Sequence, residues 1–309
     1  MTRITRIAFL IVVAAILLSV VSCTRTGQKL SHKIIVVAAS FPVYDMARSI
    51  GGDKADVSLL LPPGVEAHAF EPTAGDIVRI NEADIFVYTN RFMEPWAAVL
   101  AKSASSKKLR IVDASTGVTL MSAVGHEEKE RKGALDPHIW LDFGDAKIMV
   151  RDILAAFVVQ DRDNAGFYEK NAADYTGHLD ELDKRYRTTL ASCRSRELVY
   201  GGHYAFGYLA ARYGLNYRAA QGVAPDAEPS ARDLVALVDQ IRKDHISHVF
   251  YEELTSPKIA ETLARETNAQ LLLLNAAHNI ARDQRDQGVT FYQIMVRNLE
   301  NLKTGLGCK

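Results

Sequence analysis

The sequence lacks several features that would place it in a familiar class of protein. Its 37 basic and 37 acidic side chains give no net charge, so the basic stripe of a nucleic-acid-binding protein is missing. Low-complexity tracts and short-period repeats are absent. Neither the H-E-x-x-H motif of zinc proteases nor a G-x-S-x-G nucleophile motif occurs. The chain of 309 residues, 48% of them hydrophobic, therefore has the composition of an ordinary globular protein with one large or two medium domains.

The N-terminus carries a long apolar run, from Ile7 to Val21, preceded by two arginines and followed by Ser22 and Cys23. The run is short for a full membrane span, and its flanks are typical of an export signal. Val-Val-Ser-Cys also resembles the lipobox of bacterial lipoproteins, in which the cysteine is acylated. We expect residues 1–23 to form a lipoprotein signal peptide with lipidated Cys23, and 24–32 a tether to a membrane surface, in the periplasm or at the cell surface. The alternative is an uncleaved anchor helix.

Cysteine is scarce, with three residues in the whole chain. If Cys23 is lipidated, Cys193 and Cys308 remain as an even pair. Disulfides persist outside the cytoplasm, so we predict a bond that joins the last helix to the second half of the chain. The alternative is two unpaired thiols.

Short apolar runs alternate with helix-length segments in both halves of the chain. Such alternation predicts parallel sheets covered by helices. Four runs in each half predict an α/β protein with two lobes of similar design, at 33–162 and 192–309. The runs cover residues 34–40, 56–61, 83–89, 109–115, 197–203, 215–220, 248–254 and 269–276.

The segment between the two lobes has the pattern of one long helix over residues 163–191. Apolar side chains recur at steps of three and four, and charged side chains fill the opposite face. No proline interrupts it. We therefore predict a stiff rod between the lobes instead of a flexible linker. The apolar stripe consists of Tyr175, Leu179, Leu182, Tyr186 and Leu190.

Four of the nine histidines follow predicted strands, two in each lobe: His68 and His138 in the first, His203 and His278 in the second. Ligand-binding loops gather at the carboxyl ends of parallel strands. We therefore expect these four side chains to face a shared cleft. The other histidines are predicted to lie on the solvated surface: His32, His126, His178, His245 and His248.

The sequence around these histidines favours a metal site. A Pro-Pro-Gly triplet stiffens the approach to His68, and Pro137 does the same for His138. Asp136 and Asp142 are close enough in sequence to orient imidazole rings by accepting hydrogen bonds. Imidazole nitrogens suit zinc, although copper, nickel or iron would accept the same ligand type.

Three segments together resemble the histidine motifs of the ABC-transporter solute-binding proteins for zinc and manganese, the TroA/ZnuA-like family. These segments are PPGVEAHAFEPTAGDI, DPHIWLD and GGHYAFGYLAARYGL, and FYEELTSPKIAETLARET resembles the helix motif that follows them in the family. The resemblance runs from about Ile34 to the C-terminus. It implies two Rossmann-like lobes, each with a four-stranded parallel sheet, joined by one long backbone helix, with a metal in the cleft. By motif, His68, His138 and His203 are implied as ligands.

The fourth metal ligand departs from the family pattern. Many members have an aspartate at the end of the last strand, where this chain has Asn275. His278, three residues further on, would complete an all-nitrogen shell, and we rank it first. Glu252 is the second candidate, either as a ligand or as an acceptor that orients a ligand, and Asn275 is the third. Manganese favours harder oxygen ligands, so a shell of histidines indicates zinc.

The resemblance implies a non-enzymatic protein that captures a divalent cation, Zn²⁺ with Mn²⁺ as the alternative, and delivers it to an ABC permease driven by an ATPase. We expect a monomer that binds no nucleic acid. Alternatives are a manganese-specific binding protein of the same family, a surface adhesin for cell adhesion, and a zinc hydrolase. A hydrolase would need an open coordination position and a general base, for which Glu252 is the candidate.

Overall fold

The computed structural model describes residues 33–104, 106–122, 135–223 and 229–309. The expected signal peptide, Cys23 and the tether lie outside these residues, as do His32 and His126. Residues 34–309 form one compact unit. Within the described ranges, no helix is both long enough and apolar enough to cross a membrane.

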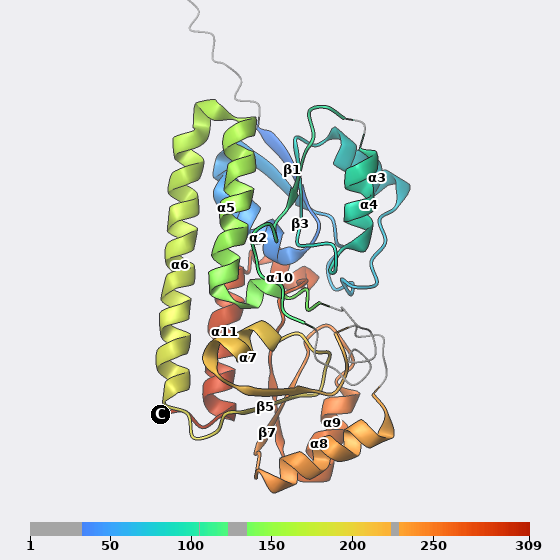
Figure 1. Cartoon of the computed structure of the whole chain (residues 1–309), viewed down its shortest axis with the longest axis vertical. Coiled ribbons are helices and arrows are strands. Elements are labelled where there is room, and N and C mark those ends of the chain that lie inside the picture. The colour runs from blue at the N-terminus through green and yellow to red at the C-terminus, as the bar shows by residue number, and fades with distance from the viewer. Residues whose placement is uncertain (1–32, 105, 123–134, 224–228) are drawn as a thin grey trace, which may run out of the picture. The chain divides into compact units, whose positions relative to one another are not determined.

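Two parallel sheets of four strands each form the centres of the two lobes (Figure 1). The first sheet has the strand order β2-β1-β3-β4, and the second has the matching order β6-β5-β7-β8. Each strand lies within or next to an apolar run predicted from the sequence, so the two-lobed α/β fold is confirmed. The strands are β1 (Ile34–Ala38), β2 (Ala55–Leu59), β3 (Ile85–Tyr88), β4 (Arg110–Asp113), β5 (Glu197–Tyr200), β6 (Asn216–Ala219), β7 (His248–Tyr251) and β8 (Gln270–Leu273).

Helices cover both faces of the first sheet, which explains why its two central strands, β1 and β3, are apolar throughout. Val36 and Ala38 of β1 pack into the core shared with α2 and α5, while Val37, and Ala39 just after the strand, face the core under α3 and α4. The two faces are therefore buried separately. The helices are α2 (Phe41–Gly51), α3 (Ala74–Glu82), α4 (Pro95–Ser103) and α5 (Phe143–Gln160).

The second lobe repeats this arrangement. Leu198 and Tyr200 of β5 join the large core with α7 and α11, and Val199 faces the smaller core under α8 and α9. The helices of the second lobe are α7 (Gly207–Tyr213), α8 (Ala231–Lys243), α9 (Lys258–Thr267), α10 (Arg282–Asp286) and α11 (Phe291–Gly305).

Three single-turn 3₁₀ helices precede the second lobe in the chain. They are η1 (Gly52–Lys54), η2 (Ile139–Leu141) and η3 (Arg162–Asn164).

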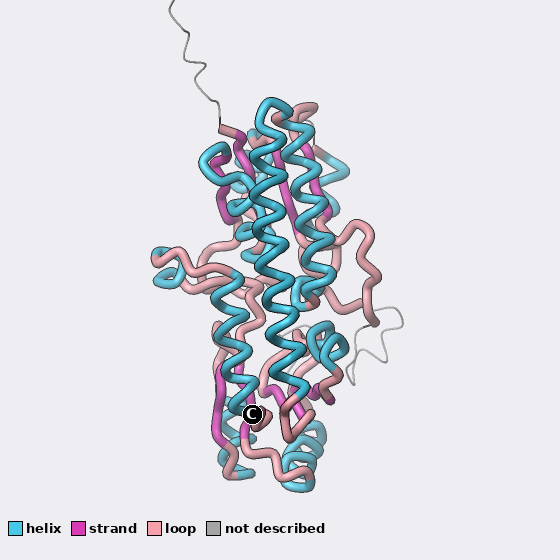
Figure 2. The backbone as a smooth tube through the Cα atoms, turned by 90° about the vertical axis from the view of Figure 1, so that its left-hand side faces the viewer, coloured by secondary structure: helices cyan, strands magenta, loops and turns pink. Residues whose placement is uncertain are grey.

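The rod between the lobes is α6 (Ala165–Ala191), whose 27 residues extend about 40 Å. It runs beside α5 and α11 (Figure 2). The Tyr175 hydroxyl donates to Asp45 of α2 at 3.1 Å, and the Tyr186 hydroxyl donates to the carbonyl of Met295 in α11 at 2.7 Å. One helix is thus packed against both lobes. All five residues of the predicted apolar stripe are buried.

The predicted disulfide between Cys193 and Cys308 is present and closes a sequence separation of 115 residues. Cys193 follows the end of α6, and Cys308 follows the end of α11. The bond therefore staples the last helix to the point where the chain enters the second lobe.

Candidate metal centre

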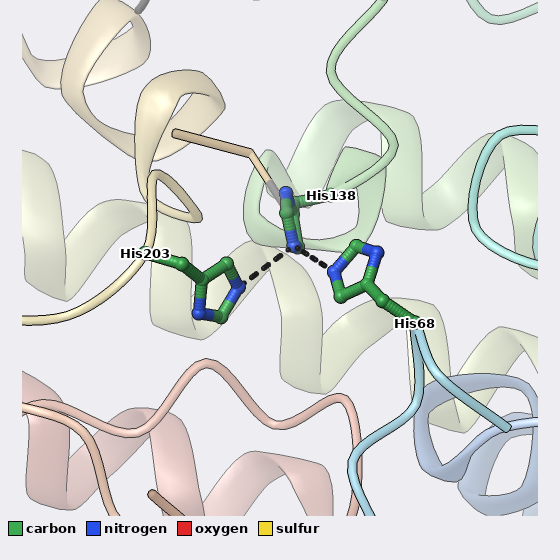
Figure 3. Close-up of side chains that lie close together, drawn as sticks. All are labelled: His68, His138 and His203. Atoms are coloured by element: carbon green, nitrogen blue, oxygen red, sulfur yellow. Dashed lines mark hydrogen bonds between the residues drawn. The ribbon is translucent and has the colours of Figure 1, made fainter. Parts of the chain in front are cut away.

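Three histidines from three separate segments converge on one point (Figure 3). His68 lies in the loop after β2, His138 immediately before η2, and His203 after β5. Nε2 of His138 is 3.2 Å from Nε2 of His68 and 3.2 Å from Nε2 of His203. A tetrahedral zinc with Zn–N bonds of about 2.0–2.1 Å would place its nitrogen ligands about 3.3 Å apart. The spacing of these nitrogens therefore fits one shared cation.

His278, after β8, completes a second group with His203 and Glu252. Nε2 of His278 is 3.9 Å from Oε1 of Glu252 and 4.0 Å from Oε1 of Glu66. These two carboxylate oxygens and both ring nitrogens of His278 are buried without a hydrogen-bond partner among the described residues. Buried polar atoms are normally satisfied, so their convergence here marks a place where a cation would supply the missing interaction.

Each lobe supplies one carboxylate that orients an imidazole. Asp136 accepts from Nδ1 of His138 at 2.7 Å, and Glu252 accepts from Nδ1 of His203 at 2.8 Å. A proton held on Nδ1 leaves the lone pair of Nε2 directed at the shared point. The expectation for Asp136 is confirmed, and Glu252 acts as an acceptor for a candidate ligand.

Asp142 was expected to orient an imidazole as well, and this expectation is wrong. Its carboxylate instead accepts from the backbone of Gly144 at 2.6 Å, at the start of α5. The same oxygen pairs with Arg212 of α7 at 2.7 Å. An aspartate just before a helix caps the free backbone amides of the first turn, and this local role takes its carboxylate away from the histidines.

Asn275, the third-ranked candidate for the fourth ligand, shapes the backbone after β8. Its Oδ1 accepts from the backbone of Ala277 at 2.7 Å, and its own N–H donates to Asn298 of α11 at 2.9 Å. The amide oxygen is thus engaged within the turn. Ala277 has a positive φ of 57°, and His278 follows it directly.

Burial controls the charge state of the site. It lowers the pKa of His68 and His138 well below the ordinary value, and the neighbouring histidines add to this effect. Burial also lowers the pKa of His278 to about 4. At neutral pH these three rings are therefore neutral, which is the form that binds a metal.

His203 differs from the other three histidines. Burial disfavours its charged form, but the Glu252 carboxylate, together with those of Glu66 and Asp136, outweighs burial and raises the pKa of His203. In return, the charge of His203 offsets the burial of Glu252 and lowers the pKa of Glu252 to about 2. The bond between the two residues therefore favours the protonated form of His203 and the ionised form of Glu252.

The remaining histidines lie away from this site wherever the structure describes them. His178 of α6 and His245 are exposed, as expected, while His248 is half-buried and bonds to Ser247 at 2.9 Å. Two site residues were missed from the sequence. One is Glu66, which stands two residues before His68 and whose acidic side chain was the available signal; the other is Asn279, whose amide contacts the loop that leads to His68 and for which the sequence offered no signal.

A two-lobed α/β fold with a histidine cluster between its sheets defines a metal-binding protein. A family profile described as "Zinc-uptake complex component A periplasmic" matches residues 36–305. The chain is 38% identical over 311 residues to the high-affinity zinc uptake system protein ZnuA of Bacillus subtilis, covering 96% of this chain and 97% of that protein. The chain belongs to this zinc-uptake family, as the resemblance implied.

The zinc-binding protein AdcA of Streptococcus pyogenes serotype M3 is 36% identical over 297 residues, covering 91% of this chain. The chain spans 58% of the length of that relative. The family is one of zinc uptake and not of catalysis, in agreement with the expectation of a non-enzymatic protein.

Solved structures show the same fold. The metal-dependent lipoprotein YcdH of Bacillus subtilis superposes with a TM-score of 0.77 at 39% identity, covering 89% of this chain and 99% of that chain. The Zn(II)-bound ZnuA-like domain of Streptococcus pneumoniae AdcA gives 0.76 at 34% identity, with the same coverage. The laminin-binding protein Lmb of Streptococcus agalactiae gives 0.78 at 30% identity, again with that coverage.

Proposed function

We propose that this protein captures Zn²⁺ between its two lobes and delivers it to an ABC permease in the membrane. The convergence of the three Nε2 atoms of His68, His138 and His203, at spacings of 3.2 Å, carries the proposal. Two of these rings are already oriented by carboxylates, so little reorganisation precedes binding. The Zn(II)-bound structures of relatives support the same conclusion.

His278 is the proposed fourth ligand. It is 3% exposed and has two unpartnered ring nitrogens, whereas the amide oxygen of Asn275 is engaged with Ala277. Glu252 retains one free oxygen, but its other oxygen holds His203. Four imidazoles would form a closed tetrahedral shell of nitrogen, which favours zinc over manganese.

A closed shell also argues against hydrolysis, because a catalytic zinc keeps one position open for substrate. One oxygen of Glu252, the candidate general base, is engaged by its bond to His203. Some structural relatives carry laminin-binding names. Those names describe the relatives, and no group among the described residues of this chain identifies an adhesive surface.

The proposed layout is a lipoprotein with Cys23 as its anchor, a tether at 24–32, and lobes at 33–162 and 192–309 on either side of a helix at 163–191. A relative in Streptococcus pneumoniae is named a zinc-binding lipoprotein. The anchor would keep a monomer at the outer surface of a membrane, beside the permease and its ATPase. Because α6 packs against both lobes, metal loss should produce small loop shifts and not a wide hinge motion.

Metal analysis of protein purified without chelator, followed by competition titration with zinc and manganese, tests the proposal. We expect one equivalent of zinc and a clear preference for zinc over manganese. The His138→Ala variant should lose the bound zinc. A wild-type protein that binds neither metal, or a variant that binds zinc as wild type does, would refute the proposal.

A further inference from the structure

The turn after β8 belongs to the second lobe but contacts the His68 loop of the first. We call residues 275–280 the strap. The strap carries His278, and its six residues are all buried. Its backbone meets the first lobe directly, because the Phe41 N–H donates to the carbonyl of His278 at 3.2 Å.

Asn279 makes the shortest of these contacts. Its Nδ2 donates to the carbonyl of Pro62 at 2.8 Å and to that of Val65 at 2.6 Å. Next to it, the Gly64 N–H donates to the carbonyl of Ile280 at 3.1 Å. These bonds hold the Pro-Pro-Gly segment that leads to His68. Asn279 itself is 1% exposed, so the donor side of its two bonds is shielded from water.

The strap is fixed just as firmly to its own lobe. Asn298 of α11 accepts from the N–H of Asn275 at 2.9 Å and donates to the Asn275 carbonyl at 2.7 Å. Asn275 in turn accepts from Ala277. A continuous set of hydrogen bonds therefore runs from α11, through the strap that carries His278, to the loop that carries His68.

We infer that Asn279 is a positioning residue that couples His68 of the first lobe to His278 of the second and thereby slows zinc release. This inference rests on the proposed function. For zinc to leave, the loop of His68 must move, and that movement breaks both bonds of the Asn279 amide. An alanine at 279 would remove the donor from the carbonyls of Pro62 and Val65 and free the loop, while every proposed ligand remained in place.

The test measures zinc dissociation into excess chelator, together with hydrogen exchange of the zinc-loaded protein, in Asn279→Ala and wild type. We expect release to accelerate by about 10-fold or more, in the range found when residues that orient metal ligands are removed. Amide exchange should accelerate in residues 62–69 and stay unchanged in α6. A local effect of this kind separates positioning from general loss of structure.

Asn301→Ala is the matched control, because Asn301 donates to the Leu273 carbonyl at 2.8 Å and has no bond to the His68 loop in the structure. It should release zinc at the wild-type rate. The inference is overturned if Asn279→Ala also releases zinc at that rate, if Asn301→Ala accelerates release equally, or if exchange in α6 accelerates as much as in the loop. A wild-type protein that retains no zinc would instead refute the proposed function itself.

Discussion

Glu252 accepts a hydrogen bond from Nδ1 of His203 at 2.8 Å, and both side chains are buried. The bond turns Nε2 of His203 toward Nε2 of His138. Asp136 has the same relation to His138 in the first lobe. Each lobe thus contributes one imidazole whose direction is set by a carboxylate from its own lobe, and the two imidazoles meet in the cleft.

Glu252→Gln should weaken zinc binding by about 10- to 100-fold, because the His203 ring loses the acceptor that orients it. Competition titration against a chelator of known affinity measures the loss. Glu253→Gln is a suitable control, since the neighbouring side chain bonds to Gln284 of α10 and not to a histidine of the site. Equal affinities of the two variants would contradict the orienting role.

Alanine at position 68, 138 or 203 should weaken zinc binding by about 100-fold or more, because each change removes one nitrogen from a closed shell. Isothermal titration of the metal-free variants measures the effect. His178→Ala, on the exposed face of α6, should bind as wild type does. Wild-type titration curves for all three variants would show that these histidines do not bind the zinc.

His278→Ala should weaken zinc binding by about 10-fold or more, whereas Asn275→Ala should retain most of the affinity. The reason is that the His278 nitrogens are free to bind and the Asn275 oxygen is engaged in the turn. Parallel titrations of the two variants decide the order. A greater loss of zinc affinity in the Asn275 variant would identify Asn275, and not His278, as the fourth ligand.

Zinc affinity should begin to fall, on acidification, above the ordinary histidine pKa of about 6.5. The pKa of His203 is raised by Glu252, so this ring takes up a proton first, and zinc must then displace it. Glu252→Gln removes the carboxylate that contributes most to raising the pKa of His203, so the onset should move to lower pH. Competition titrations between pH 8 and 5 measure the pH at which zinc affinity begins to fall in each protein. A variant whose affinity begins to fall at the same or a higher pH than that of wild type would contradict the assignment of this effect to His203 and Glu252.

Removal of the disulfide, by Cys193→Ser with Cys308→Ser, should lower the free energy of unfolding by about 2–5 kcal/mol, since the bond closes a long loop in the unfolded chain. Urea denaturation with and without the two changes measures it. Zinc affinity should not change, because Cys193 precedes β5 and His203 follows that strand. A loss of affinity would show that the disulfide influences the geometry of the metal site.

The elements predicted from the sequence are those that a local pattern specifies. Apolar runs identified the strands, a stripe of three- and four-residue steps identified α6, and strand ends identified the four histidines. Asp142 was misjudged because its helix-capping role depends on α5 beginning at the next residue. The role of Asn279 depends on a contact across more than 200 residues, which no local pattern carries.

The two tyrosine anchors of α6 stand 11 residues apart, Tyr175 on Asp45 of α2 and Tyr186 on Met295 of α11. A helix advances about 1.5 Å and turns about 100° with every residue. One residue inserted between the anchors would therefore rotate one lobe by more than a quarter turn and pull the histidines of the two lobes out of line. The number of residues between the two anchors of α6 therefore sets both the distance and the rotation between the lobes. The length of the helix is in this sense as much a requirement of the metal site as the side chains in the cleft.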